Sequence, residues 1–188
     1  MRTVFLIICG LFVACAGATE AWDLNQLMHT LAQVKAMNAR FQERKELAVL
    51  AEPLLLAGTL RYQAPHYLQK HTLQPHEERY TVDQDWLTIE TSEGQRNLYL
   101  PGHAEVGALV EAIRATLAGD LTNLERYYRL QLQGSPSAWT LRLEPLNKQM
   151  AEYVSAIIFQ GQGERVLNVE TLESGGDRSV MTIEPTHE

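Results

Sequence analysis

Hydrophobic residues recur along this chain with two different spacings, and each spacing predicts a type of element. Over residues 22–38 they fall three or four positions apart, which places them on one side of a helix. Over residues 106–117 the same spacing predicts a second helix, with Gly119 as its C-terminal stop and Asp120 able to cap a short helical turn through Arg126. The two apolar stripes are Leu24, Leu27, Met28, Leu31 and Val34, and Val106, Leu109, Val110, Ile113 and Leu117.

Most of the remaining chain has the two-residue spacing of β-strands. In the clearest run, residues 54–62, every second residue shares one face until Ala64-Pro65 opens a turn. Similar runs, separated by turns rich in Gly, Pro and Asp, predict about eleven strands in all. Segment 40–47 is polar and is expected at an edge of the sheet. The other predicted strands are 67–73, 78–83, 86–91, 96–100, 128–132, 139–144, 154–160, 165–173 and 178–184.

The connections between these strands predict how the sheet is built. Turn-length connections are too short for parallel crossovers, so the sheet should be largely antiparallel. A sheet of this size must curl or close to protect its inner face, and the two long helices are available to cover that face. The sequence shows no internal repeat and no linker of disordered composition. We therefore expect a mainly β protein with a helical lid, folded as a single domain over residues 19–188.

The N-terminal segment has the pattern of an export signal. Met1-Arg2 provides a short positive start, residues 4–14 are almost entirely apolar, and Ala16-Gly17-Ala18 forms a small-residue cleavage site. The apolar run is too short to span a bilayer. We expect residues 1–18 to be a signal peptide that directs a soluble mature protein to the periplasm. In a rival interpretation, the sequence before Cys15 is a lipobox and the cysteine is acylated and kept.

Charge and cysteine content exclude several kinds of partner and site. Of the 188 residues, 45% are hydrophobic, which is too many for a disordered chain, and the net charge is −7. That charge argues against nucleic acid or an anionic membrane surface as a partner. Cys9 and Cys15 are the only cysteines and both precede the predicted cleavage site. The mature chain would therefore have no disulfide, thiolate metal site or cysteine nucleophile.

The sequence contains no recognisable catalytic or metal-binding motif. His66, His71 and His76 are five residues apart, and that spacing puts His66 and His71 on opposite faces of a strand. There is no nucleophile elbow, phosphate loop or dinucleotide fingerprint. We therefore expect no catalytic residue, no metal, no cofactor and no enzymatic activity. The remaining apolar surface either fills a core or lines a cavity suited to an acyl chain, and composition does not decide between them.

The order of motifs in the chain resembles that of the periplasmic lipoprotein-carrier family, the LolA-like and LolA-related proteins. The resemblance covers nearly the whole mature chain. Its main pieces are residues 38–43 after the first helix, 56–65 with a G-x-L-x-x-x-x-P pattern, 117–120 at the end of the second helix, 139–145, and 157–183. The resemblance implies an incomplete antiparallel β-barrel of about eleven strands, covered by two to three helices that act as a lid over acyl chains.

The resemblance also implies which side chains line the cavity. Leu31 and Val34 match inner positions of the first helix, Leu68 matches an apolar position after the proline, and Leu117 falls on the lid helix. With the residues of the apolar stripes and of the 54–62 run, the expected lipid-binding wall is Leu27, Leu31, Val34, Leu60, Tyr62, Leu68, Leu109, Ile113 and Leu117. Well-studied members carry an arginine before the proline that latches the lid. Here Ala64 stands there, and Arg61 should point to the opposite face.

The function implied by the resemblance is carriage of lipidated cargo. A monomer would take the acyl chains of lipoproteins, or a related lipid, from an inner-membrane donor complex. It would then carry them across the periplasm to an outer-membrane acceptor. The alternative is an interaction or sensor module on the same half-barrel that regulates an envelope partner. A lipid-processing enzyme is a third, weaker possibility.

Overall fold

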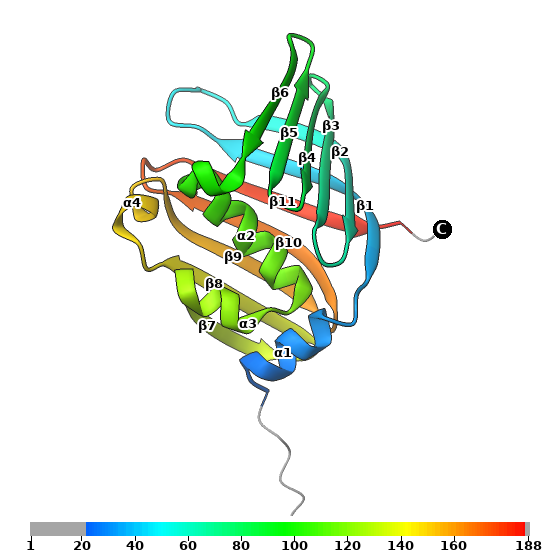
Figure 1. The fold of residues 1–188 in the computed structure, drawn as a ribbon, viewed down its shortest axis with the longest axis vertical. Coiled ribbons are helices and arrows are strands. Elements are labelled where there is room, and N and C mark those ends of the chain that lie inside the picture. The colour runs from blue at the N-terminus through cyan, green and yellow to red at the C-terminus, as the bar shows by residue number, and fades with distance from the viewer. Residues whose placement is uncertain (1–21, 187–188) are drawn as a thin grey trace, which may run out of the picture.

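One antiparallel sheet organises residues 22–186, the part of the chain that this computed structural model describes (Figure 1). Its 11 strands follow the order β6-β5-β4-β3-β2-β1-β11-β10-β9-β8-β7. The strands are β1 (Ala36–Glu46), β2 (Leu54–Gln63), β3 (Tyr67–Gln74), β4 (Glu78–Asp83), β5 (Trp86–Thr91), β6 (Gly94–Tyr99), β7 (Tyr128–Ser135), β8 (Ala138–Pro145), β9 (Val154–Gln162), β10 (Arg165–Glu173) and β11 (Arg178–Pro185). The helices are α1 (Leu24–Leu31), the 3₁₀ turn η1 (Leu100–Gly102), α2 (Ala104–Ala118), α3 (Leu121–Tyr127) and α4 (Lys148–Ala151).

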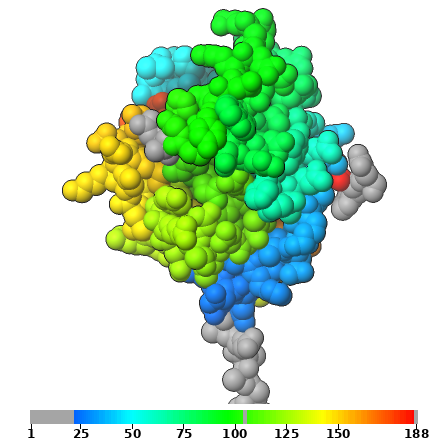
Figure 2. Space-filling view, in the orientation of Figure 1, coloured from blue at the N-terminus to red at the C-terminus, as the bar shows by residue number. Residues whose placement is uncertain are grey.

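The sheet is strongly curved but open. The pairing of β1 with β11 joins two meanders, β1–β6 and β7–β11. The outer strands β6 and β7 stand at opposite ends of the strand order. Figure 1 shows the sheet curving around α2, with α1 and α3 beside it on the same concave side. In the space-filling view α2 and α3 cover the middle of this face (Figure 2). The prediction of a mainly β, antiparallel incomplete barrel with a helical lid is therefore confirmed.

The predicted edge position of segment 40–47 is wrong. β1 lies at the middle of the sheet, paired with β2 on one side and with β11 on the other. Its polar residues alternate with three buried ones, Ala39, Phe41 and Glu43, so one face of the strand is in the interior. The pattern looked like an edge strand because the buried face includes a carboxylate, which normally marks an exposed position.

The first helix is shorter than predicted. α1 ends at Leu31, and β1 begins at Ala36, where Ala36 is paired with Gln63 of β2. Bonds from the Gln33 amide to the Thr30 carbonyl (3.2 Å) and from the Val34 amide to the Leu31 carbonyl (3.0 Å) turn the chain. The pairing of β1 with two neighbours therefore overrides the helical spacing after Leu31. The short helix α4 was not predicted, because four residues carry no periodic signal.

The helix boundaries near Gly119 follow the sequence prediction. Gly119 ends α2 with φ 69°, and a Cβ there would overlap the Met28 carbonyl oxygen of α1. The Asp120 carboxylate then accepts a bond of 3.1 Å from the Asn123 amide and caps α3. These two residues let α2 reverse into α3 while lying directly against α1.

Two apolar clusters fill the space between the helices and the concave face. The main cluster joins α1, α2 and α3 to strands from β1 and β7–β11, and its centre includes Trp139, Leu141, Leu143 and Phe159. A smaller cluster of Val82, Leu87 and Leu100 lies under β3–β6. Burial of this kind contributes about 1.5–3 kcal/mol per large side chain and is the main force holding the lid on the sheet.

Among the described residues, none of the helices combines the length and the apolar character needed to cross a bilayer. The predicted signal peptide, with Cys9 and Cys15, lies outside the described residues.

Candidate functional site

Most of the side chains predicted to line a cavity come together under the lid. Leu27 and Leu31 of α1 are buried in the main cluster. The other four in this group, Leu60 of β2 and Leu109, Ile113 and Leu117 of α2, are half-buried and pack against it. Residues separated by up to 90 positions in the sequence thus form one apolar surface between two helices and the sheet.

The other three predicted residues are placed differently. Leu68 of β3 packs against the smaller cluster. Tyr62 of β2 is only 2% exposed, and its neighbours across the sheet are Met37 of β1 and Leu68. Val34 lies half-buried in the turn that follows α1. The structure thus brings Tyr62 and Leu68 to the concave side without joining them to the main group, and it leaves Val34 outside both apolar clusters.

Small side chains form the most deeply buried part of the contact between the lid helix α2 and the core. Ala112, Ala115 and Thr116 are fully buried, and the Thr116 hydroxyl is satisfied by the Ala112 carbonyl at 2.7 Å. Its large residues, including Ile113 and Leu117, remain partly exposed beside this contact. These small buried residues bring less apolar area out of water than leucines at the same positions would.

Side-chain hydrogen bonds tie α2 to the sheet at two places. The Tyr128 hydroxyl of β7 donates to the Ala108 carbonyl oxygen of α2 at 2.9 Å. The Arg114 Nη1 donates to the Gln84 carbonyl oxygen at 2.7 Å, in the turn between β4 and β5. Its Nη2 pairs with Glu111, and Glu111 also accepts from Asn123 of α3. Arg61, the residue near the proline, stands instead over the Tyr67 ring at 5.8 Å. Sequence reasoning missed Arg114, whose carbonyl partner lies 30 residues away.

The concave face also contains a buried polar group that the sequence analysis did not single out. Glu43 of β1 pairs with Lys70 of β3 and accepts a bond of 2.5 Å from the Ser179 hydroxyl of β11. The Lys70 ammonium lies 5.0 Å from the centre of the Phe41 ring. Phe41 in turn lies across Gly58, which has no side chain to hold it away. The alternation of Ala39, Phe41 and Glu43 was the signal that could have revealed this face.

The two charges of this pair experience opposing influences. Burial raises the pKa of Glu43, but Lys70, the Ser179 hydroxyl and Lys45 together offset it and bring the pKa below its ordinary value. Burial lowers the pKa of Lys70, and the nearby Glu43 only partly compensates. The lowered pKa keeps Glu43 ionised at neutral pH, and the pair interrupts the apolar lining toward the end of β1.

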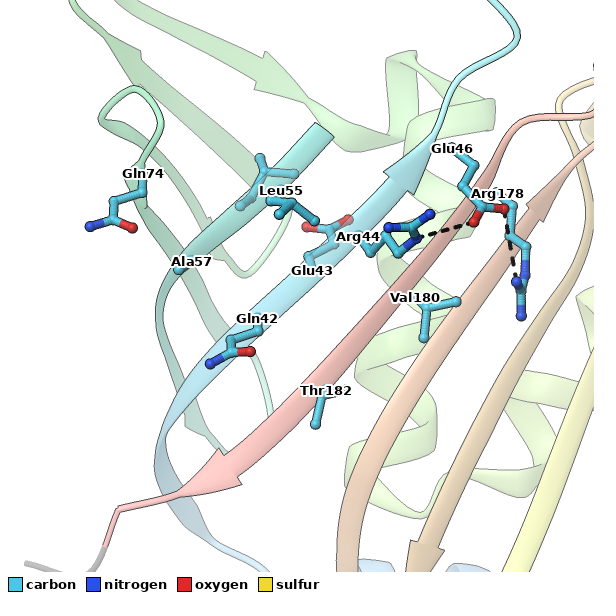
Figure 3. A pocket seen from close by; sticks show the side chains of 11 residues that line it. Gln42, Glu43, Arg44, Glu46, Leu55, Ala57, Gln74, Arg178, Val180 and Thr182 are labelled. Carbon is cyan, nitrogen blue, oxygen red and sulfur yellow. Dashed lines mark hydrogen bonds and ion pairs between the residues drawn. The ribbon is translucent and has the colours of Figure 1, made fainter. Parts of the chain in front are cut away.

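Two adjoining grooves lie on the opposite, convex face of the sheet. The larger, of about 610 Å³, runs along β1 between Leu55 of β2 and Val180 of β11 (Figure 3). In this view the helices lie behind the sheet. The smaller, of about 310 Å³, continues past Leu73. Arg44 and Arg178 at the larger groove both pair with Glu46, at 3.1 and 3.9 Å. This open outer surface mixes polar and apolar side chains, and its charged groups pair with one another.

The histidines do not form a site. His71 lies 2.8 Å from Glu77, while His66 and His76 are exposed outside the strands. Within residues 22–186, no group of three or more His, Cys, Asp or Glu residues is placed to hold a metal ion. The described concave side is lined mainly by apolar side chains, with the Glu43–Lys70 pair among them.

Several solved structures are similar to this chain at low sequence identity. The chain is similar in structure to a LolA superfamily protein from Nitrosomonas europaea (9% identity, 89% of this chain and 95% of that chain, TM-score 0.47). It is also similar to the Mycobacterium tuberculosis lipoprotein LppX (9% identity, 86% and 93%, TM-score 0.43). A third similar structure is MucB in the Pseudomonas aeruginosa MucA/MucB complex (13% identity, 86% and 56%, TM-score 0.43). No curated protein sequence matches the chain significantly.

The family assignment comes from the sequence as a whole. Residues 16–183 match the model of a family described as outer membrane lipoprotein carrier protein LolA-like. The match spans most of the chain and includes every strand and helix described above except the last residues of β11. This chain therefore belongs to the LolA-like family of outer membrane lipoprotein carrier proteins.

Proposed function

We propose that this LolA-like protein is a non-catalytic carrier that holds the acyl chains of a lipoprotein or related lipid between its helices and the concave face of its sheet. The observation that carries the proposal is the apolar surface formed by Leu27, Leu31, Leu60, Ile113 and Leu117 beneath a helix that is only partly buried. This surface binds by desolvation and needs no reactive group.

The energetics favour such a ligand. Each methylene of an acyl chain gains about 0.8 kcal/mol when it leaves water, so a single chain can supply several kcal/mol without covalent attachment. The protein's own side chains occupy this side when the lid is closed. A ligand must therefore displace α2, which is held by apolar packing and by the side-chain bonds of Arg114 and Tyr128.

The cellular role proposed is transport across the periplasm. A signal peptide over residues 1–18 would export the chain, an inner-membrane donor complex would load it, and an outer-membrane acceptor would receive the cargo. Since the ligand would be handed from one membrane to another, a lid of moderate strength is useful, because it must both close and reopen.

The test is whether the exported protein carries lipid. Native mass spectrometry of protein purified from its own envelope should show apolar ligand, and apo protein should take up a fluorescent acyl probe. Ile113→Glu places a charge in the apolar surface and should reduce uptake at least tenfold, by about the cost of an unpaired buried charge. Val106→Glu is the matched control, because Val106 is on the same helix but exposed.

Each outcome decides between the hypotheses. Bare protein with no probe uptake would contradict the carrier proposal. Recovery of a protein partner in place of lipid, with Ile113→Glu leaving that partner bound, would favour the regulatory module instead. Turnover of acyl esters above the buffer rate would point to an enzyme.

A further inference from the structure

One hydroxyl on the concave side has nothing to bond to. Among the described residues, two buried side-chain polar atoms lack a hydrogen-bond partner, the indole nitrogen of Trp22 and the hydroxyl of Tyr62. Trp22 lies at the start of the described residues, two positions before α1. Tyr62 lies near the end of β2, a strand paired on both sides, and its exposed fraction is 2%. Buried hydroxyl groups almost always have a partner, so this exception calls for an explanation.

The position of Tyr62 is at the junction of the two apolar clusters. Across the sheet it pairs with Met37, which packs against the main cluster, and with Leu68, which packs against the smaller one. Tyr62 therefore lies between the two halves of the surface that the proposed ligand would occupy. The nearest charged residue facing inward along β3 is Lys70, and it is already paired with Glu43.

The chemistry of this hydroxyl restricts what could satisfy it. Burial raises the pKa of Tyr62, so the phenol keeps its proton and remains a donor. A buried donor without a protein partner, whose paired neighbours Met37 and Leu68 are apolar, is complemented by a group that accepts a hydrogen bond and carries no charge. The ester or amide carbonyl at the head of an acyl chain has both properties, and it is attached to the hydrocarbon that the surrounding leucines would bind.

We propose that the Tyr62 hydroxyl donates a hydrogen bond to the acyl carbonyl of the bound lipid, so that the site selects acyl lipids over hydrocarbons or alkyl ethers of the same length. The inference rests on the carrier function proposed above. It specifies the ligand class and fixes the depth of the chain, because the carbonyl must stop where the two clusters meet.

The experiment compares two lipids that differ only in whether their two chains are attached through acyl carbonyls. Binding of a dipalmitoyl glycerol ester and of the dihexadecyl glycerol ether is measured with the apo protein and with Tyr62→Phe. The wild type should prefer the ester by about tenfold, the value of one hydrogen bond in an apolar site. Tyr62→Phe should lower ester affinity to that of the ether and leave ether affinity unchanged.

Stability and a second tyrosine provide the controls. Tyr62→Phe removes a hydroxyl without a partner, so the melting temperature of the apo protein should stay the same or rise. Tyr80 is half-buried and its hydroxyl donates to Glu78 at 3.1 Å. Tyr80→Phe should therefore lower the melting temperature slightly and leave the ester preference intact.

The outcomes separate this inference from the carrier proposal. Equal binding of ester and ether by the wild type would overturn the role of Tyr62 while leaving the carrier function standing. Unchanged ester affinity in a folded Tyr62→Phe protein would have the same meaning. Failure of the wild type to bind either lipid would overturn both. If Tyr62→Phe does not fold, the wild-type preference alone decides.

Discussion

At the scale of single residues, Glu43 is a charged residue that is buried in the interior of the described part of the chain. Its carboxylate is buried in the concave face and contacts Lys70 and Ser179, which come from strands on either side of β1. A carboxylate in such a place costs free energy to desolvate and is retained only with charged and hydroxyl partners. Glu43 thereby connects the two meanders of the sheet through side chains as well as through the backbone.

Replacing this carboxylate should destabilise the protein. Glu43→Gln keeps the shape of the side chain but leaves Lys70 without its charged partner, so the free energy of unfolding should fall by about 1–3 kcal/mol in urea titrations. Glu46→Gln is the control, because Glu46 forms exposed pairs with Arg44 and Arg178 and should cost less than about 1 kcal/mol. Equal effects of the two substitutions would show that the burial of Glu43 is energetically unimportant.

The same residue predicts a pH dependence. The folded pKa of Glu43 lies below its ordinary value of 4.5, so its contribution is fully present above that pH and is lost as pH falls through the lower, folded value. The difference in unfolding free energy between wild type and Glu43→Gln should stay constant from neutral pH to about pH 5 and shrink at lower pH. A difference that grows on acidification would mean that Glu43 is not ionised in the folded protein.

At the scale of elements, β2 approaches the backbone of β3 and the Phe41 ring closely at Gly58. A Cβ at this position would overlap the His71 carbonyl oxygen of β3 and lie 2.9 Å from the Phe41 ring. Because a backbone oxygen cannot move aside cheaply, Gly58→Ala should cost about 3 kcal/mol or prevent folding, as measured by urea unfolding. Gly102→Ala is the matched control, since nothing lies within 4 Å of its Cβ position. Similar stability of the two variants would contradict this packing.

The attachment of α2 gives a prediction about motion. Arg114→Ala removes the bond from the lid helix to the Gln84 carbonyl, so α2 should open more often. Hydrogen exchange of its amides should quicken by about tenfold, while the amides of β8 and β9 stay protected. Arg126→Ala on α3, where the side chain is exposed, should change neither region. Uniform acceleration throughout the protein would indicate global destabilisation in place of a local lid.

The sequence predicted those elements that depend on the spacing of hydrophobic and turn residues within a few positions. The strand runs, the turn residues and the caps at Gly119 and Asp120 came out as predicted because each depends on residues within a few positions. The end of α1 and the place of β1 were wrong because strand pairing, formed with residues up to 146 positions away, overrode the local pattern. Arg114 and Glu43 were missed for the same reason.

At the scale of the whole molecule, the protein is an open curved sheet that depends on its helices to cover the apolar side. No disulfide is available to hold it if the segment with Cys9 and Cys15 is removed. We predict that protein recovered from the envelope begins at Thr19, which an intact mass spectrum can verify. A mass that retains Cys15 with added acyl groups would instead support the lipobox interpretation. With cleavage after Ala18, a reducing agent should leave the melting temperature unchanged.

The sequence by itself determined the class of the fold, the number of strands, the two main helices and the family, because these follow from local periodicity and from motifs in order along the chain. It also indicated most of the apolar residues that meet beneath the lid. Only the tertiary structure decided that β1 is central, that Glu43 and Lys70 pair on the concave side, that Arg114 ties the lid, and that the Tyr62 hydroxyl has no partner. Each of these depends on atoms brought together from distant parts of the chain, where spacing along the sequence carries no information about distance.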